Sequence, residues 1–81
     1  MNVSIYSTPT CPYCKMAKEF LTQHNIAFEN IDVAADEKKA DEMVAKSGQR
    51  GVPVIVITKD DGQEEVIIGF DKVRLKSALE L

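Results

Sequence analysis

The sequence has no apolar run approaching the roughly 20 residues that cross a bilayer. Its first residues also lack the basic cluster and long apolar stretch of a secretory signal. Basic residues are not in excess, since 10 lysines and arginines face 13 aspartates and glutamates and leave a net charge of −3. A chain without a basic stripe has little with which to neutralise phosphates. We therefore expect no membrane and no nucleic acid as partner, and a reducing, cytoplasmic location.

Metal-binding residue types are few, because the chain has two cysteines and one histidine. A structural zinc site takes about four ligands. His24 is also predicted to lie about three helical turns from Cys11. An iron–sulfur cluster shared between two chains would use one cysteine from each. A metal- or cluster-binding module therefore stays open only as an alternative that rests on the two thiols.

The chain of 81 residues is long enough for one domain, spanning 1–81, with a thin core. Apolar residues make up 44% of the chain, which is enough to offset the entropy lost on folding. The sequence shows no repeat, linker or low-complexity segment. We expect a single folded domain, and nothing in the sequence requires more than a monomer.

Short β-prone runs alternate with amphipathic segments along the chain. We predict strands at 3–6, 27–33, 52–58 and 66–68, and helices that begin at Pro12, after Asp36 and after Asp71. The order β-α-β-α-β-β-α favours a right-handed crossover between two parallel strands, followed by an antiparallel hairpin. The fold class is therefore α/β, with a four-stranded mixed sheet and helices on both faces.

Residue spacing also predicts how the helices end and pack. Asn25 is a candidate left-handed cap of the first helix, and Gly48 is expected to end the second. Phe70 and Leu75 flank the start of the third helix at the spacing of a hydrophobic staple. The apolar stripe expected on the first helix consists of Met16, Ala17, Phe20, Leu21 and His24.

Cys11 and Cys14 lie at the junction between the first predicted strand and the first helix. Free N–H groups at a helix N-terminus stabilise negative charge, which favours a thiolate at Cys11. The thiolate is the attacking species in disulfide exchange, and the spacing lets Cys14 reach a sulfur bonded to Cys11. A structural disulfide closing so short a loop would add little stability. The pattern therefore predicts a redox-active dithiol in which Cys11 attacks and Cys14 resolves.

Two further segments have two interpretations each. Pro53, in Gly51-Val52-Pro53, can begin a strand in the commoner trans state, because proline cannot donate to a sheet ladder. Alternatively it is cis and turns the Val52 main chain toward the dithiol, where an extended substrate could add hydrogen bonds. The second segment, Gly69-Phe70-Asp71, is either a loop with a helix cap or a helix N-terminus that receives a carboxylate or peptide.

The segments 6–14, 49–53 and 69–71 together resemble the glutaredoxins, and Cys-Pro-Tyr-Cys is the dithiol signature of that family. The resemblance extends over nearly the whole chain. It implies a thioredoxin-like fold, a nucleophilic Cys11, a resolving Cys14 and a cis peptide bond before Pro53. The candidate substrate- or glutathione-binding residues are Thr10, Pro12, Tyr13, Gln49, Arg50, Gly51, Val52, Pro53, Gly69, Phe70 and Asp71.

Three positions depart from the usual glutaredoxin pattern. Thr8 replaces a basic residue, Gly51 replaces a threonine, and the segment Gly69-Phe70-Asp71-Lys72 lacks one glycine and one acidic residue of the family segment. These changes resemble the glutaredoxin-like redoxins that donate electrons to ribonucleotide reductase and are reduced by thioredoxin reductase. Those redoxins commonly lack the Pro-Tyr pair, so the sequence combines features of both groups.

The expected function is reduction of protein or mixed disulfides by an enzyme-like electron carrier without a bound cofactor. The reductant is either glutathione or a flavoprotein of the thioredoxin reductase type, and the partners are disulfide-containing proteins. A protein that binds its partner in a redox-dependent way without turnover is a further possibility from another class.

Overall fold

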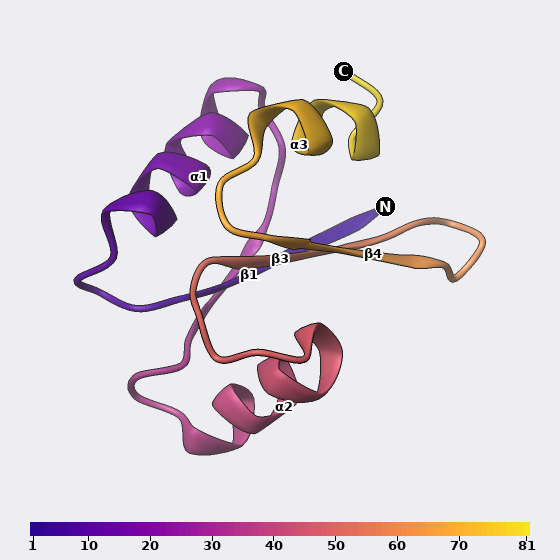
Figure 1. Ribbon diagram of the computed structural model, residues 1–81. Coiled ribbons are helices and arrows are strands. Elements are labelled where there is room, and N and C mark those ends of the chain that lie inside the picture. Colours follow the sequence, from indigo (N-terminus) through magenta and orange to yellow (C-terminus); the bar gives the residue numbers. More distant parts are fainter.

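The computed structural model describes residues 1–81, and its elements follow the predicted order (Figure 1). The strands are β1 (Asn2–Ser7), β2 (Glu29–Asp32), β3 (Val54–Thr58) and β4 (Glu64–Ile68). The helices are α1 (Pro12–Gln23), α2 (Glu37–Ser47) and α3 (Lys72–Ala78). None of the three helices has the length and apolar composition needed to cross a bilayer.

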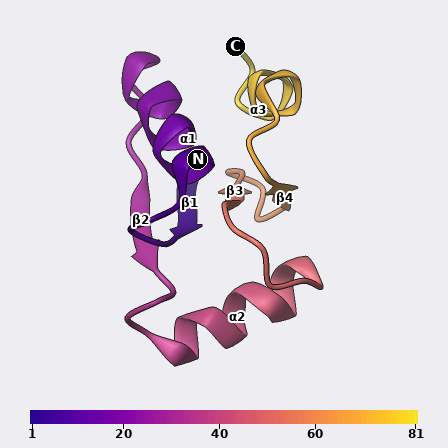
Figure 2. The same ribbon diagram turned by 60° about the vertical axis from the view of Figure 1, so that its left-hand side comes forward.

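The four strands form one sheet in the order β2-β1-β3-β4. β1 is parallel to β2 and antiparallel to β3, and β4 is antiparallel to β3. Figure 2 shows α1 and α3 on one side of the sheet and α2 on the other. The mixed four-stranded sheet with helices on both faces is therefore confirmed.

Two hydrophobic clusters hold these layers together. The larger lies between the sheet and the helices α1 and α3, and its eleven buried residues include Ile5, Leu21 and Ile55. The smaller lies between the sheet and α2, and it contains Tyr6, Ile31, Met43, Val54 and Val56. Side chains alternate between the two faces of a strand, so β3 supplies buried residues to both clusters. This explains its nearly continuous run of β-branched residues.

The predicted helix boundaries are set by local capping. Pro12 occupies the first turn of α1, and Asn25 takes a positive φ of 58° just after that helix. Asp36 caps α2 by accepting a hydrogen bond from the Lys39 N–H, and Gly48 ends α2 with a φ of 76°. These short-range signals were sufficient to place both ends of α2.

The predicted stripe of α1 is partly wrong. Met16 is 46% exposed and His24 is exposed, whereas Cys14 is fully buried. The face of α1 that meets the sheet therefore begins one turn earlier than predicted and ends at Leu21. The exposed His24 ring lies beside Phe20, with the two ring centroids 4.5 Å apart.

The predicted strand bounds also need correction, and β1 and β4 each extend beyond the predicted 3–6 and 66–68. The third strand begins at Val54 and not at residue 52, because the Val52–Pro53 unit takes no part in the ladder. The second strand is shorter than 27–33, since the chain pairs with β1 only over Glu29–Asp32.

Phe70 packs against the larger cluster, and its ring meets Phe20 edge-on at a centroid separation of 5.9 Å.

Candidate active site

Cys11 occupies the N-cap position of α1, directly after the turn that follows β1. Its backbone is extended, with φ −91° and ψ 111°, and its N–H donates to the Thr8 carbonyl at 3.4 Å. In this conformation the sulfur of Cys11 accepts a hydrogen bond from the Cys14 N–H at 3.1 Å. A helix N–H directed at the sulfur favours negative charge there. The predicted position of Cys11 at the helix N-terminus is therefore confirmed.

Cys14 lies one turn further along α1 and is fully buried, whereas Cys11 is partly exposed. Both cysteines are thiols in this structure. Burial, reinforced by the side-chain hydrogen bond with Cys11, raises the pKa of the Cys14 thiol to about 11. A protonated and inaccessible Cys14 is a poor attacking group toward a molecule arriving from solvent. The structure thus makes the two thiols chemically unequal.

The segment before β3 brings a main-chain carbonyl to the dithiol. The Val52–Pro53 peptide bond is cis, as the resemblance implies, and Pro53 is buried. The Cys11 thiol donates to the Val52 carbonyl at a sulfur–oxygen distance of 3.9 Å. Residues 41 positions apart in the chain therefore meet at the reactive sulfur.

Gly69 and its neighbours form the third part of the site. The Gly69 N–H donates to the Pro53 carbonyl at 2.8 Å, and Gly69 has a positive φ of 79° that suits glycine. Asp71 caps α3 by accepting from the Arg74 N–H at 3.1 Å. The predicted cap is therefore present, and the same segment also borders the Val52–Pro53 unit.

The remaining candidate residues lie within or next to these segments in the chain. Tyr13 is 63% exposed on the first turn of α1, and Thr10 and Pro12 are also exposed. Arg50 is exposed and makes no ion pair. Gln49 is half-buried, and its side chain turns back onto the main chain of Gly51.

Sequence reasoning missed two features of the site. The burial of Cys14 was signalled by its spacing from Ala17 and Leu21, which places all three on one face of a helix. The edge-on contact between Phe20 and Phe70 ties α1 to the Gly69 segment. No local signal indicated that contact, because it joins residues 50 positions apart in the chain.

No group of three or more histidine, cysteine, aspartate or glutamate side chains comes together in a way that could hold a metal ion. Any metal at Cys11 and Cys14 would therefore need ligands from another molecule.

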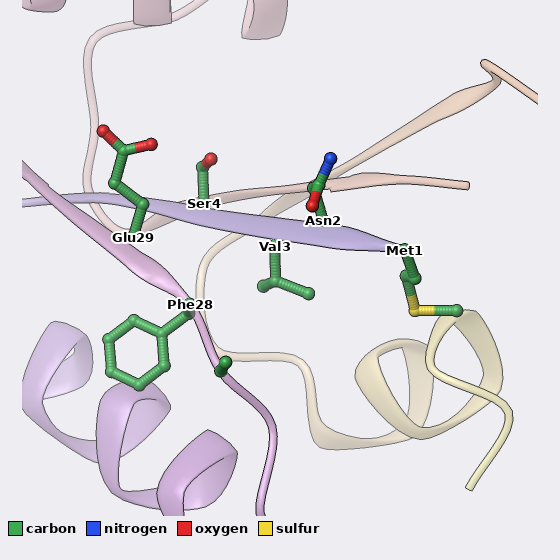
Figure 3. Close-up of a pocket in the computed structure, with 7 residues that line it drawn as sticks. Met1, Asn2, Val3, Ser4, Phe28 and Glu29 are labelled. Atoms are coloured by element: carbon green, nitrogen blue, oxygen red, sulfur yellow. The ribbon is translucent and has the colours of Figure 1, made fainter. Parts of the chain in front are cut away.

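A separate open pocket of about 510 Å³ lies at the N-terminal end of β1. Figure 3 shows Val3 and Phe28 pointing to one side of the strands there, and Ser4 and Glu29 to the other. The pocket includes neither cysteine, since the dithiol follows the opposite end of β1. It is therefore not part of the candidate active site.

Comparison with known proteins shows the family of the chain. The glutaredoxin family model matches residues 3–61. A glutaredoxin-like 8.6 kDa protein from the rubredoxin operon of Clostridium pasteurianum is 47% identical over 78 residues, which cover 96% of this chain and 97% of that protein.

Two solved structures share the fold. The thioredoxin-like protein BC3987 superposes with a TM-score of 0.82 and 32% identity, covering 95% of this chain and 99% of that one. The glutaredoxin-like NrdH-redoxin of Escherichia coli superposes with a TM-score of 0.80 and 26% identity, covering 95% and 93%. The predicted thioredoxin-like fold is therefore confirmed.

Proposed function

The chain belongs to the glutaredoxin family of thiol–disulfide oxidoreductases, and we propose that it reduces protein or mixed disulfides through Cys11 and Cys14. One observation carries the proposal: a partly exposed sulfur at a helix N-cap lies one turn from a buried thiol. The first sulfur is open to a substrate, and the second can reach only the first.

In the proposed reaction the Cys11 thiolate attacks one sulfur of a substrate disulfide. A bond forms between that sulfur and Cys11, the substrate disulfide breaks, and the other substrate sulfur leaves as a thiolate. The Cys14 sulfur then attacks Cys11, and its proton passes to the departing substrate thiolate. The products are a reduced substrate and a Cys11–Cys14 disulfide, so two electrons have moved from the protein to the substrate.

The raised pKa of Cys14 fits the order of these steps. A thiol that stays protonated at neutral pH does not compete with Cys11 for the first attack. Once Cys11 is part of a mixed disulfide, the two sulfurs are held close together, and proximity offsets the small thiolate fraction of Cys14. The same burial excludes outside thiols from the resolving position.

We propose that the substrate is held beside the cis Val52–Pro53 unit, where the Val52 main chain lies next to the reactive sulfur. Tyr13 and the Gly69-Phe70-Asp71 segment would border the bound molecule from α1 and α3. The proposed reductant is glutathione, as the Cys-Pro-Tyr-Cys signature suggests. The protein would act as a monomer without a bound cofactor in a reducing cytoplasm.

A second candidate for the reductant is a flavoprotein of the thioredoxin reductase type. It is favoured by the similarity to the NrdH-redoxin of Escherichia coli, whose structure is described as explaining a thioredoxin-like activity profile. Ribonucleotide reductase is the corresponding candidate substrate, from the resemblance carried by Gly51 and Phe70. Thr8, in place of a basic residue, fits the same alternative.

The test compares two reductants on the oxidised protein: glutathione with glutathione reductase, and thioredoxin reductase with NADPH. We expect Cys11→Ser to abolish disulfide reduction with either donor. The matched variant Cys14→Ser, incubated with the substrate without added glutathione, should still form a mixed disulfide but fail to release it, which mass spectrometry detects. Full activity of Cys11→Ser would disprove the proposal. Partner binding without any turnover would instead favour a redox-dependent binding protein.

A further inference from the structure

The side chain of Gln49 forms a clamp on the main chain of Gly51, two residues along the chain. Its Oε1 accepts a hydrogen bond from the Gly51 N–H at 2.6 Å, and its Nε2 donates to the Gly51 carbonyl at 2.9 Å. Both polar groups of the carboxamide are thus engaged by one residue. We call this pair of hydrogen bonds the Gln49–Gly51 clamp.

The clamp is anchored at the end of α2. The Ser47 hydroxyl lies 2.7 Å from the Met43 carbonyl and 2.9 Å from the Gln49 carbonyl, and it accepts from the Gln49 N–H at 3.4 Å. The main chain of Gln49 is therefore held against the last turn of a packed helix. Its side chain extends that support to Gly51, which no strand pairing fixes.

The clamp acts next to the reactive sulfur. Gly51 immediately precedes Val52, whose carbonyl faces the Cys11 sulfur at 3.9 Å. On the other side of Val52, the chain is fixed by buried Pro53, whose carbonyl accepts from the Gly69 N–H. The Gln49–Gly51 clamp is the corresponding constraint on the N-terminal side of Val52. The main chain is therefore held both before and after Val52.

The clamp also explains why residue 51 is a glycine. A Cβ atom placed on Gly51 would lie 2.7 Å from the Gln49 Oε1, closer than real Cβ contacts. Apart from Gly51 and its two chain neighbours, the atoms nearest to that Cβ are all from Gln49, and no atom of another residue is closer than 4.0 Å. Gly51 does not have a positive φ. A side chain at position 51 is therefore opposed by Gln49 and not by the backbone conformation.

We propose that Gln49 is a positioning residue that holds the Val52 main chain in place for substrate docking. We also propose that residue 51 is glycine because a side chain there would displace the side chain of Gln49. This inference rests on the proposed disulfide reductase function. Gln49 itself need not contact the substrate, since its polar atoms are already paired within the loop. Loss of the clamp should weaken docking along Val52 and leave the chemistry of the two thiols unchanged.

The test is a double-mutant cycle with Gln49→Ala, Gly51→Ala and both together. Each single change should raise the KM for a disulfide substrate about 10-fold with little change in kcat, since a displaced docking segment costs one to two orders of magnitude. The double variant should be no worse than either single one, because a methyl group at position 51 meets nothing once the side chain of Gln49 is shortened. Gln63→Ala, in the exposed β3–β4 turn, is the matched control and should behave as the unaltered protein.

Two readouts separate positioning from general damage. The rate of alkylation of Cys11 by iodoacetamide, a reagent too small to need the docking segment, should be unchanged in every variant. Hydrogen exchange of the N–H of residue 51 should be faster in Gln49→Ala and in Gly51→Ala, because the bond to Oε1 is lost in both.

Other results would overturn the inference. Multiplied effects in the double variant, about 100-fold in KM, would show that the residues act independently. If Gln49→Ala were impaired and Gly51→Ala were not, Gln49 would contact the substrate directly. An unaltered protein without disulfide reductase activity would overturn the proposed function itself, whereas an active protein with an additive cycle would overturn only the clamp.

Discussion

The inequality of the two thiols gives a sharp prediction for their rates of alkylation. Iodoacetamide at pH 7 should modify Cys11 and leave Cys14 unmodified on the same timescale. Cys14 is fully buried, and its thiol has a pKa of about 11 in place of the ordinary 9.0. Both properties slow its reaction, because the thiolate is the reacting form and the reagent must reach it.

The magnitude follows from the pKa. At pH 7 a thiol of pKa 9.0 is about 1% thiolate, whereas one of pKa 11 is about 0.01% thiolate. The more basic thiolate is also more nucleophilic, which returns roughly one of the two orders of magnitude. Ionisation alone should therefore make Cys14 about 10-fold slower than an ordinary cysteine, and burial adds to that.

The assay is peptide mapping by mass spectrometry after timed exposure to iodoacetamide between pH 6 and 10. Labelling of Cys14 should rise with pH up to the highest value tested, since its thiolate fraction grows roughly 1,000-fold between pH 7 and pH 10. The variant Cys11→Ser isolates Cys14 from the competing thiol. Equal labelling of the two cysteines at pH 7 would refute the reasoning, because it would require an accessible and ionised Cys14.

Three further predictions concern stability, measured by urea denaturation followed by circular dichroism. Leu21→Ala should lower the free energy of unfolding by about 2–5 kcal/mol, because Leu21 is fully buried, whereas exposed Met16→Ala should change it by less than about 0.5 kcal/mol. Tyr6→Phe removes the 2.6 Å hydrogen bond to Glu42 and should cost about 0.5–1.5 kcal/mol at pH 7. That bond lowers the pKa of Glu42, so its contribution to stability is present above the ordinary value of 4.5 and lost as the pH falls through the lowered pKa. If Tyr6→Phe were destabilised at acid pH by as much as at pH 7, this account would be contradicted. Asp71→Ala should cost about 0.5–2 kcal/mol by removing the cap of α3, and Asp71→Asn should restore most of it.

Much of the fold was predictable because its signals are local. Asp36 and Gly48 mark the ends of α2 by capping chemistry that involves only neighbouring residues. The β-branched run before Lys59 indicated a strand buried on both faces, and β3 supplies both clusters. Local hydrogen bonding and backbone preference are properties of short segments, so they are readable from short segments.

The errors in the predicted stripe of α1 arose at its edges, where Met16 and His24 are exposed. Met16 and Cys14 are two positions apart and therefore lie on different sides of α1, and the spacing of Cys14 from Ala17 and Leu21 already favoured the side that is buried. Apolar periodicity indicates which side of a helix faces the core. It does not determine how wide the buried stripe is or where along the helix it ends. The final choice depends on the angle at which that face meets β1 and β3.

The same division holds for the dithiol. The sequence by itself determined that Cys11 and Cys14 lie one turn apart at the start of a helix, because spacing and a following Pro12 set that geometry locally. Only the tertiary structure decided that the Val52 carbonyl lies at the Cys11 sulfur and that the Gly69 N–H binds the Pro53 carbonyl. These contacts join segments far apart in the chain, and their positions depend on the register in which β1, β3 and β4 pair.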